Sequence, residues 1–174
     1  MSRTVTSPRA VGVIRGSFVL VVTSLLLTSG LVISSTVSAS AVTENLAGPV
    51  VMSSDAYEKA VHRRVNVVRK AHGLPRLRIQ SCTDRVAERW NNHLATKDLF
   101  YHQSMRKILY RCDARYAGET LGRGAITPRV LVRMWMQSEG HRAVLMSPHA
   151  RRIGVAAQQD AFGRWVTTAN FMRF

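Results

Sequence analysis

The sequence lacks the short motifs that mark the best-known classes of enzyme. It has no G-x-S-x-G nucleophile elbow, no H-E-x-x-H zinc motif, no P-loop and no C-x-x-C pair. Each of these motifs needs a fixed residue spacing to hold a nucleophile, a metal ion or a phosphate group. Their absence excludes the serine hydrolases, metalloproteases, nucleotide hydrolases and thiol oxidoreductases that depend on them.

Acidic residues are scarce. The chain has 10 Asp and Glu against 25 Lys and Arg, which gives a formal net charge of +15. A charge of this sign raises encounter rates with polyanions, and salt weakens the attraction. Outside a cell the polyanions are wall polymers, anionic lipid headgroups and shed nucleic acid. Charge alone does not choose among these partners, and a general contribution to solubility explains it equally well.

Charges are also nearly missing from the first 41 residues, where the only ones are Arg3, Arg9 and Arg15. An apolar stretch from Ser17 to Val37 follows, and then the small-residue pattern Ala39-Ser40-Ala41. A positive start, an apolar middle and a small-residue end are the three parts of a secretory signal. We therefore expect a signal peptide over 1–41, a linker over 42–54, one domain over 55–174, and export from the cell.

The alternative for this segment is an uncleaved anchor helix, because the apolar stretch approaches the ~20 residues that span a bilayer. Gly30 and the Ser and Thr residues of its second half weaken it as a stable span, so cleavage is favoured. The cleaved chain keeps 22 of the 25 Lys and Arg and all 10 acidic residues, a net charge of +12.

Cysteine is rare: the chain has only Cys82 and Cys112. In an exported protein an even pair favours a disulfide over two free thiols. A catalytic cysteine is the weaker alternative, because a nucleophile needs a free thiolate and a paired sulfur has none.

Hydrophobic periodicity predicts helices first and strands last. Spacing and cap residues predict helices from Ser53–Asp55 to His72, from Ser81 to about Asp98, over 105–109, over 127–138 and over 141–146. Alternation predicts strands over 153–157 and 164–174, joined by a turn over 158–163. Residues 110–126 are predicted to be irregular, with a plain turn at Gly122-Arg123-Gly124. This order of elements is typical of the α+β class.

Two local patterns add detail to these helices. Asp55 and Glu58 have the spacing of a capping box at the start of the first helix. In the helix that begins at Thr127-Pro128, the residues Leu131, Met134 and Trp135 form the expected buried stripe.

Three polar residues are prominent because of their surroundings. His102 follows two aromatic residues, Glu119 follows a glycine, and His141 follows Gly140 at a helix end. Imidazole and carboxylate groups suit two tasks, binding a divalent metal or moving protons near neutral pH. Their spacing does not show that they meet, and from the residues alone three separate structural polar groups are the favoured explanation.

The order of the motifs is specific. Phe100-Tyr101-His102, Gly118-Glu119, the W-M-x-S-x-G-H-R segment over 135–142 and Arg152-Ile153-Gly154-Val155 occur in that sequence. The run resembles the CAP superfamily, the cysteine-rich secretory, antigen and pathogenesis-related group with SCP domains, in its short bacterial secreted branch. The resemblance covers about residues 55–174. It implies a three-layer α-β-α sandwich and strands near 116–122.

The resemblance also implies a cavity. His102 and His141 match the family's two cavity histidines, and Glu119 matches the acid of its Gly-Glu-Asn motif. Thr120 stands in place of that Asn, and Ser138 stands where animal and plant members carry a second acid. Two imidazoles and one carboxylate with an open position would suit zinc. The missing second acid argues against tight metal binding.

For function, the resemblance and the charge favour a secreted binding module that has a His/Glu cavity. Its ligand would be an anionic lipid or wall polymer of the cell envelope. The alternative is a metal-assisted extracellular hydrolase in which His102, His141 and Glu119 hold a metal-bound water. Nucleic-acid binding rests on charge alone and ranks last. We further expect a monomer that is secreted or associated with the cell wall and touches the membrane only through its signal segment.

Overall fold

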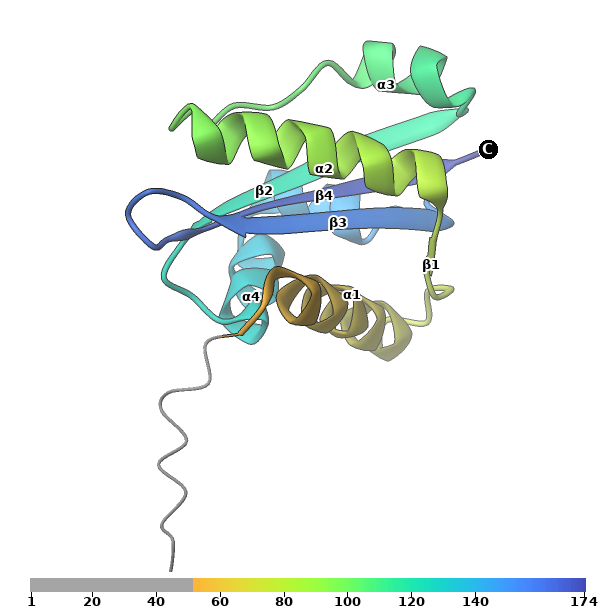
Figure 1. Ribbon diagram of the computed structural model, residues 1–174. Helices are drawn as coiled ribbons and strands as arrows, with labels where there is room; N and C mark the ends of the chain where they lie inside the picture. The colour runs from red at the N-terminus through yellow and green to blue at the C-terminus, as the bar shows by residue number, and fades with distance from the viewer. Residues whose placement is uncertain (1–51) are drawn as a thin grey trace, which may run out of the picture. The chain divides into compact units, whose positions relative to one another are not determined.

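The computed structural model describes residues 52–174 (Figure 1). The predicted signal peptide over 1–41, and the predicted linker as far as residue 51, lie outside the described residues. The elements, in chain order, are α1 (Ser54–Ala71), β1 (Arg78–Ile79), α2 (Ser81–Thr96), α3 (Met105–Cys112), β2 (Tyr116–Gly124), α4 (Pro128–Gln137), α5 (Glu139–Leu145), β3 (Arg152–Gln159) and β4 (Trp165–Arg173).

The elements form three layers with one sheet in the middle. The sheet has the strand order β1-β3-β4-β2, in which β1 is parallel to β3 and the other pairs are antiparallel. Helices α2 and α3 lie on one face of the sheet, and α1 and α4 lie on the other (Figure 1). The predicted α+β class and the three-layer α-β-α sandwich are both confirmed.

The helices begin where the capping residues predict. The Ser53 side chain accepts a hydrogen bond from the Ala56 N–H, and the Thr127 side chain accepts one from the Val130 N–H, with Pro128 in the first turn. These caps satisfy donors that a helix start otherwise leaves unpaired. The capping box predicted for Asp55 and Glu58 does not form. Glu58 Oε1 instead accepts a hydrogen bond from Ala157 N, at 2.8 Å.

Two sequence predictions about irregular and buried residues are wrong. Most of the stretch 110–126 is ordered, because α3 continues to Cys112 and β2 runs through the expected turn at Gly122-Arg123-Gly124. The strand that the family resemblance implied near 116–122 is confirmed. Met134 is 48% exposed, and Val132 takes the buried place beside Leu131 and Trp135.

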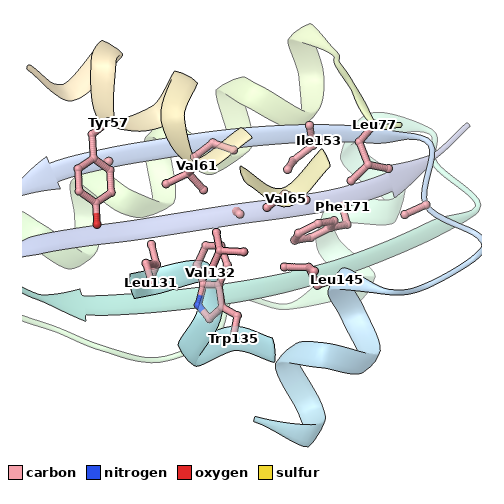
Figure 2. Close-up of a cluster of buried hydrophobic side chains, with 14 residues drawn as sticks. Tyr57, Val61, Val65, Leu77, Leu131, Val132, Trp135, Leu145, Ile153 and Phe171 are labelled. Atoms are coloured by element: carbon pink, nitrogen blue, oxygen red, sulfur yellow. The ribbon is translucent and has the colours of Figure 1, made fainter. Parts of the chain in front are cut away.

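The larger core cluster lies between the sheet and the α1/α4 layer. Tyr57, Val61 and Val65 point from α1 towards Leu131 and Trp135 of α4 (Figure 2). The Trp135 indole is also satisfied, since its Nε1–H donates to the Leu121 carbonyl of β2 at 2.8 Å. Trp135 therefore ties α4 to the outer strand of the sheet as well as filling the core.

A buried arginine joins α1 to the end of α5. The Arg69 guanidinium is fully buried and donates to the carbonyl oxygens of Pro75, Leu145, Ser147 and Ala150, at 2.8 to 3.4 Å. Burial lowers the pKa of Arg69 from its ordinary value. Carbonyl dipoles rather than a carboxylate satisfy this side chain. Three of them come from the end of α5 and the chain that leaves it, and the fourth, from Pro75, comes from the loop after α1.

The outer part of β3 is covered by side chains from both helix layers. β1 pairs with β3 only at Arg152 and Ile153. Beyond them, Asp84 of α2 accepts a hydrogen bond from Val155 N at 3.3 Å, and Glu58 of α1 caps Ala157 N. At Gly154, between the β1 pairing and Val155, α2 approaches so closely that a Cβ would collide with the backbone of Thr83 and Asp84.

The predicted disulfide is confirmed. Cys82 of α2 and Cys112 of α3 are joined, and the bridge links the two helices that cover the same face of the sheet. Within residues 52–174, no helix is both long enough and apolar enough to cross a membrane.

Candidate functional site

The candidate site is a pocket of about 420 Å³ at the outer edge of β2. It is lined by the four residues that the resemblance singled out, His102, Glu119, Ser138 and His141. His102 comes from the loop between α2 and α3, on one face of the sheet. His141 comes from α5, which packs in the same core cluster as α1 and α4. The structure therefore brings residues from both outer layers together around an edge strand.

Glu119 forms the buried wall of this pocket. Its Oε1 accepts hydrogen bonds from His102 Nδ1–H at 2.7 Å and from Gln103 N at 3.2 Å. Its Oε2 accepts from the Gln103 side-chain amide at 2.5 Å. The Glu119 side chain is 1% exposed and that of His102 is 55% exposed. Both carboxylate oxygens are thus engaged, and His102 is held so that its Nε2 remains for other contacts.

Two members of this network were not found from the sequence. Gln103 Nε2 also contacts Asn170 Oδ1 at 3.3 Å, which links the loop to the central strand β4. Asn170 lies directly opposite Glu119 in the pairing of β2 with β4. The available signal for Gln103 was its position next to His102. Asn170 gave no signal, because its role depends on the strand register.

Opposing effects act on the ionisation of the site. Burial raises the pKa of Glu119, and the hydrogen bonds from Gln103 and His102 work against that rise. Burial lowers the pKa of His141, and the nearby positive charge of protonated His102 lowers it further. The two imidazole rings have their centroids 6.1 Å apart. His141 is therefore held in its neutral form to lower pH than an exposed histidine.

A glycine allows the two layers to meet here. A Cβ on Gly118 would lie 2.8 Å from a methyl group of Val144 in α5 and 3.1 Å from the Tyr116 hydroxyl. A side chain at this position would require Val144 of α5 to shift. Gly118 therefore permits the close contact of α5 with β2 beside the pocket.

The two departures from the family motif have different consequences. Ser138 lines the pocket at the start of α5, and its side chain makes no capping hydrogen bond there. Thr120 is fully buried. Because strand side chains alternate, it lies on the opposite face of β2 from Glu119 and does not line the pocket. Only the change at Ser138 alters the chemistry of the pocket wall.

The arrangement bears on the expected zinc ligands. In the part of the chain that the structure describes, no three His, Cys, Asp or Glu side chains are grouped so that they could hold a metal ion. Glu119 contacts His102 through Nδ1 and so supports the imidazole from behind. The residues that could offer a metal a free nitrogen are His102 and His141.

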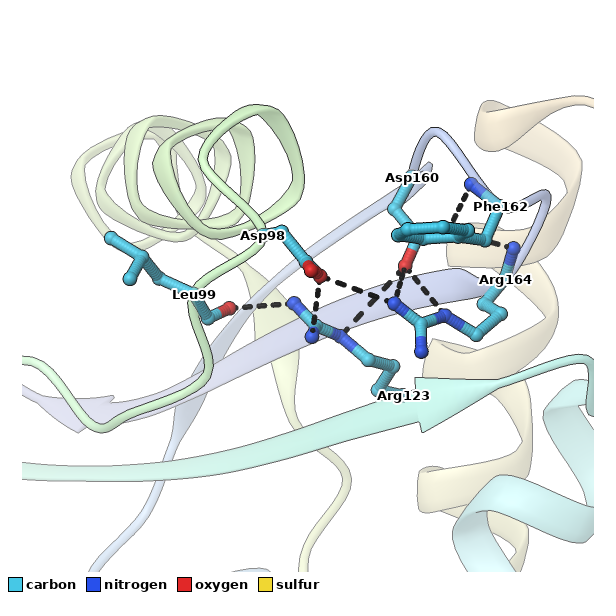
Figure 3. A network of polar contacts seen from close by, with 6 residues as sticks. All are labelled: Asp98, Leu99, Arg123, Asp160, Phe162 and Arg164. Carbon is cyan, nitrogen blue, oxygen red and sulfur yellow. Dashed lines mark hydrogen bonds and ion pairs between the residues drawn. The ribbon is translucent and has the colours of Figure 1, made fainter.

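The loop that carries His102 is anchored by ion pairs (Figure 3). Arg123 of β2 donates to Asp98 Oδ1 at 3.0 Å and to the Leu99 carbonyl at 2.6 Å, and its guanidinium lies 5.1 Å from the centre of the Phe100 ring. Arg164 bridges Asp98 to the buried carboxylate of Asp160. β2 therefore holds both Glu119 and the start of the loop whose His102 binds Glu119.

Comparison with known proteins places this geometry in a family. Residues 62–171 match the CAP family, described as the cysteine-rich secretory protein family. The uncharacterized protein YkwD of Bacillus subtilis (strain 168) is 34% identical over 111 residues, 59% of this chain and 43% of its own length. The uncharacterized membrane protein YlbC of the same strain is 26% identical over 123 residues, 67% of this chain and 34% of its own. The chain thus spans less than half the length of these curated relatives.

Solved structures show the same fold. An extracellular protein containing a SCP domain from Bacillus anthracis str. Ames has 25% identity and a TM-score of 0.58, over 73% of this chain and 45% of that one. An outer surface protein from Borrelia burgdorferi has 20% identity and a TM-score of 0.60, over 66% of this chain and 90% of that one. With more than half of its residues matched, this chain belongs to the cysteine-rich secretory protein (CAP) family.

Proposed function

We propose that this chain is an extracellular binding module for a lipid or wall polymer of the cell envelope. The signal-like N-terminal sequence supports export. The descriptions of two similar structures, an extracellular protein and an outer surface protein, point the same way. The strongly basic composition favours an anionic partner.

One observation carries the proposal: both oxygens of Glu119 are already engaged by His102 and Gln103. A general base must be within hydrogen-bond reach of the proton that it removes. Here the carboxylate is buried and its lone pairs fix neighbouring side chains instead. The pocket offers His102 Nε2, His141 and the Ser138 hydroxyl around an open volume. These groups can hydrogen-bond a polar group of a ligand, and Glu119 is not placed to act as a general base.

The alternative, a metal-assisted hydrolase, has partial support. Metal-binding histidines usually donate their second ring nitrogen to a carboxylate, as His102 does to Glu119. A catalytic zinc site normally has three protein ligands and one open position. Two imidazoles fall short of that set, so the residues do not fit a catalytic zinc. His102 and His141 would hold zinc only weakly.

The test is an untargeted capture of envelope components. The mature protein is immobilised and exposed to separate wall and lipid extracts. A His102→Ala, His141→Ala double variant tests the pocket, and His72→Ala at the exposed end of α1 is the control. We expect a retained component that the double variant loses and the control keeps. Retention of nothing, or retention unaffected by the double variant, contradicts the proposal. Chemical conversion of the component that a chelator stops would establish the hydrolase instead.

A further inference from the structure

A second cleft of about 440 Å³ lies beside the pocket, between α2, α3 and the loop that joins them. His102 lines both spaces. The other residues that matter are Trp90 of α2, Tyr101 and Ser104 of the loop, and Lys107 and Arg111 of α3. The volume is in the range of about 300–1,000 Å³ that is usual for small-molecule sites.

Part of the cleft lining is a fixed corner of two aromatic rings. Trp90 and Tyr101 are perpendicular, with ring centroids 5.0 Å apart. The Trp90 indole N–H donates to the Tyr101 carbonyl at 3.2 Å, and the Tyr101 hydroxyl contacts His93 Nε2 at 3.1 Å. These bonds hold the rings in place before any ligand arrives, which lowers the ordering cost of binding. Tyr101 nevertheless remains 48% exposed.

Another part of the cleft lining is cationic. Lys107 and Arg111 are four residues apart on α3 and therefore lie one above the other on the same helix face. Helix α3 contains no acidic residue. Among residues 52–174, neither Lys107 nor Arg111 takes part in an ion pair. Two neighbouring exposed cations without a protein counter-ion are suited to a carboxylate or phosphate of a ligand.

We infer that this cleft binds a saccharide that carries a carboxylate or phosphate group. The apolar face of a sugar ring fits against an aromatic ring, its hydroxyl groups fit Ser104 and His102, and its anionic group fits Lys107 and Arg111. The inference rests on the proposed function and narrows its ligand to an anionic polysaccharide of the envelope.

Two other classes of ligand fit the cleft less well. An acyl chain would bury the hydroxyl and cationic groups without giving them partners, which is unfavourable. Single-stranded nucleic acid binds by stacking successive bases on aromatic platforms. Trp90 and Tyr101 are perpendicular and cannot form such a platform for neighbouring bases.

The test compares two matched pairs of charges. Lys107→Gln with Arg111→Gln removes the cations of the cleft. Lys59→Gln with Arg63→Gln removes the same residue types at the same spacing from the exposed face of α1. For the aromatic corner, Tyr101→Ser is compared with Tyr110→Ser, because Tyr110 is 93% exposed on α3. Circular dichroism and thermal midpoints establish that each variant is folded.

Binding is measured at about 0.15 M salt, where distant charges are largely screened. The probes are polygalacturonate, phosphorylated dextran, neutral dextran, phosphatidylglycerol vesicles and single-stranded DNA. We expect the cleft charge pair to weaken binding of polygalacturonate or phosphorylated dextran at least about tenfold, as for lost charge-assisted hydrogen bonds. The α1 pair should change it less than about twofold, as for exposed charges. Tyr101→Ser should weaken it and Tyr110→Ser should not.

Equal losses from the two charge pairs would overturn the inference, as would tighter binding of vesicles or DNA with the same dependence on Lys107 and Arg111. Anionic polysaccharide binding that ignores the cleft variants would overturn this site alone and leave the proposed function standing. If neither polysaccharides nor vesicles bind the wild-type protein, both proposals fail.

Discussion

Glu58 makes the stability of this domain depend on pH near neutrality. Its carboxylate accepts a hydrogen bond from Ala157 N, at the part of β3 that β1 leaves uncovered. The pKa of Glu58 is raised from its ordinary 4.5 to about 7. Burial is the main cause, the hydrogen bond from Ala157 opposes it, and the negative charges of Asp55, Asp84 and Glu88 add to the rise.

The sign of the effect follows from proton binding. Between pH 4.5 and about 7 the folded protein keeps a proton on Glu58 that the unfolded chain has released. Stability is therefore highest at the acidic end and falls as pH rises through this window. One pKa unit corresponds to about 1.36 kcal/mol. Because the half-buried carboxylate still contacts water, we expect Glu58 to contribute a loss of about 1–3 kcal/mol across the window.

Glu58→Gln isolates this contribution. The amide oxygen can still accept the hydrogen bond from Ala157 N, but the side chain no longer titrates. Urea denaturation of both proteins at about pH 5, 6, 7 and 8 gives the free energy of unfolding, which is linear in denaturant. The difference between variant and wild type should shift in favour of the variant as pH rises. Glu139→Gln, at an exposed site, is the control. A difference between Glu58→Gln and wild type that is the same at every pH would refute the reasoning.

Three further predictions concern the core, the disulfide and the pocket. Arg69→Met should destabilise the fold by at least about 4 kcal/mol in urea denaturation, because four buried carbonyls lose their donors at about 1–3 kcal/mol each. Exposed Arg63→Met should change stability by less than about 0.5 kcal/mol, and equal effects would contradict the buried role. The disulfide joins cysteines 30 residues apart, and its reduction should lower the free energy of unfolding by about 3–4 kcal/mol. The comparison is urea denaturation with and without reductant. No change would show that the crosslink does not restrict the unfolded chain. Zinc titrated by calorimetry should bind weakly at about pH 7.5 and more weakly at about pH 5.5, since protons compete for the imidazoles. Binding that survives the His102→Ala, His141→Ala double change would place the metal elsewhere.

The helices were predictable because their burial is one-sided. Tyr57, Val61 and Val65 repeat at helical spacing on α1, and the cap at Ser53 marks the start. Met134 was misassigned because periodicity alone does not fix the width of a buried stripe. At the sequence level it is as apolar as Val132, and only the packing of α1 against α4 decides which of the two is covered.

Strand β2 was not predictable from periodicity because its glycines hide the alternation. Gly118 and Gly122 occupy the face where a side chain would collide with Val144 and Leu131. Side chains of the helices fill the space on that face, so the strand itself shows no apolar residues at these two positions. Alternation of apolar side chains cannot be seen where the packing of β2 against α4 and α5 requires glycine.

For the site, the resemblance identified the residues but not their arrangement. The engagement of Glu119 by Gln103, and of Gln103 by Asn170, follows from the pairing of β2 with β4 and from the path of the loop before α3. No local pattern encodes such contacts, because they join segments that are distant in the chain. That arrangement is what turns a carboxylate expected to face a metal into one that supports an imidazole.

The position of the pocket at the edge of β2 has a consequence for how a ligand can be found. Its two histidines come from separate segments, His102 from the loop before α3 and His141 from α5, and their ring centroids are 6.1 Å apart. A ligand that contacts both imidazoles therefore binds only the folded chain, and its binding adds to the free energy of unfolding. At a free concentration 100 times its Kd, this amounts to about 2.7 kcal/mol. The melting temperature of the domain is thus itself a detector of its ligand, which allows mixtures of envelope components to be screened without a label.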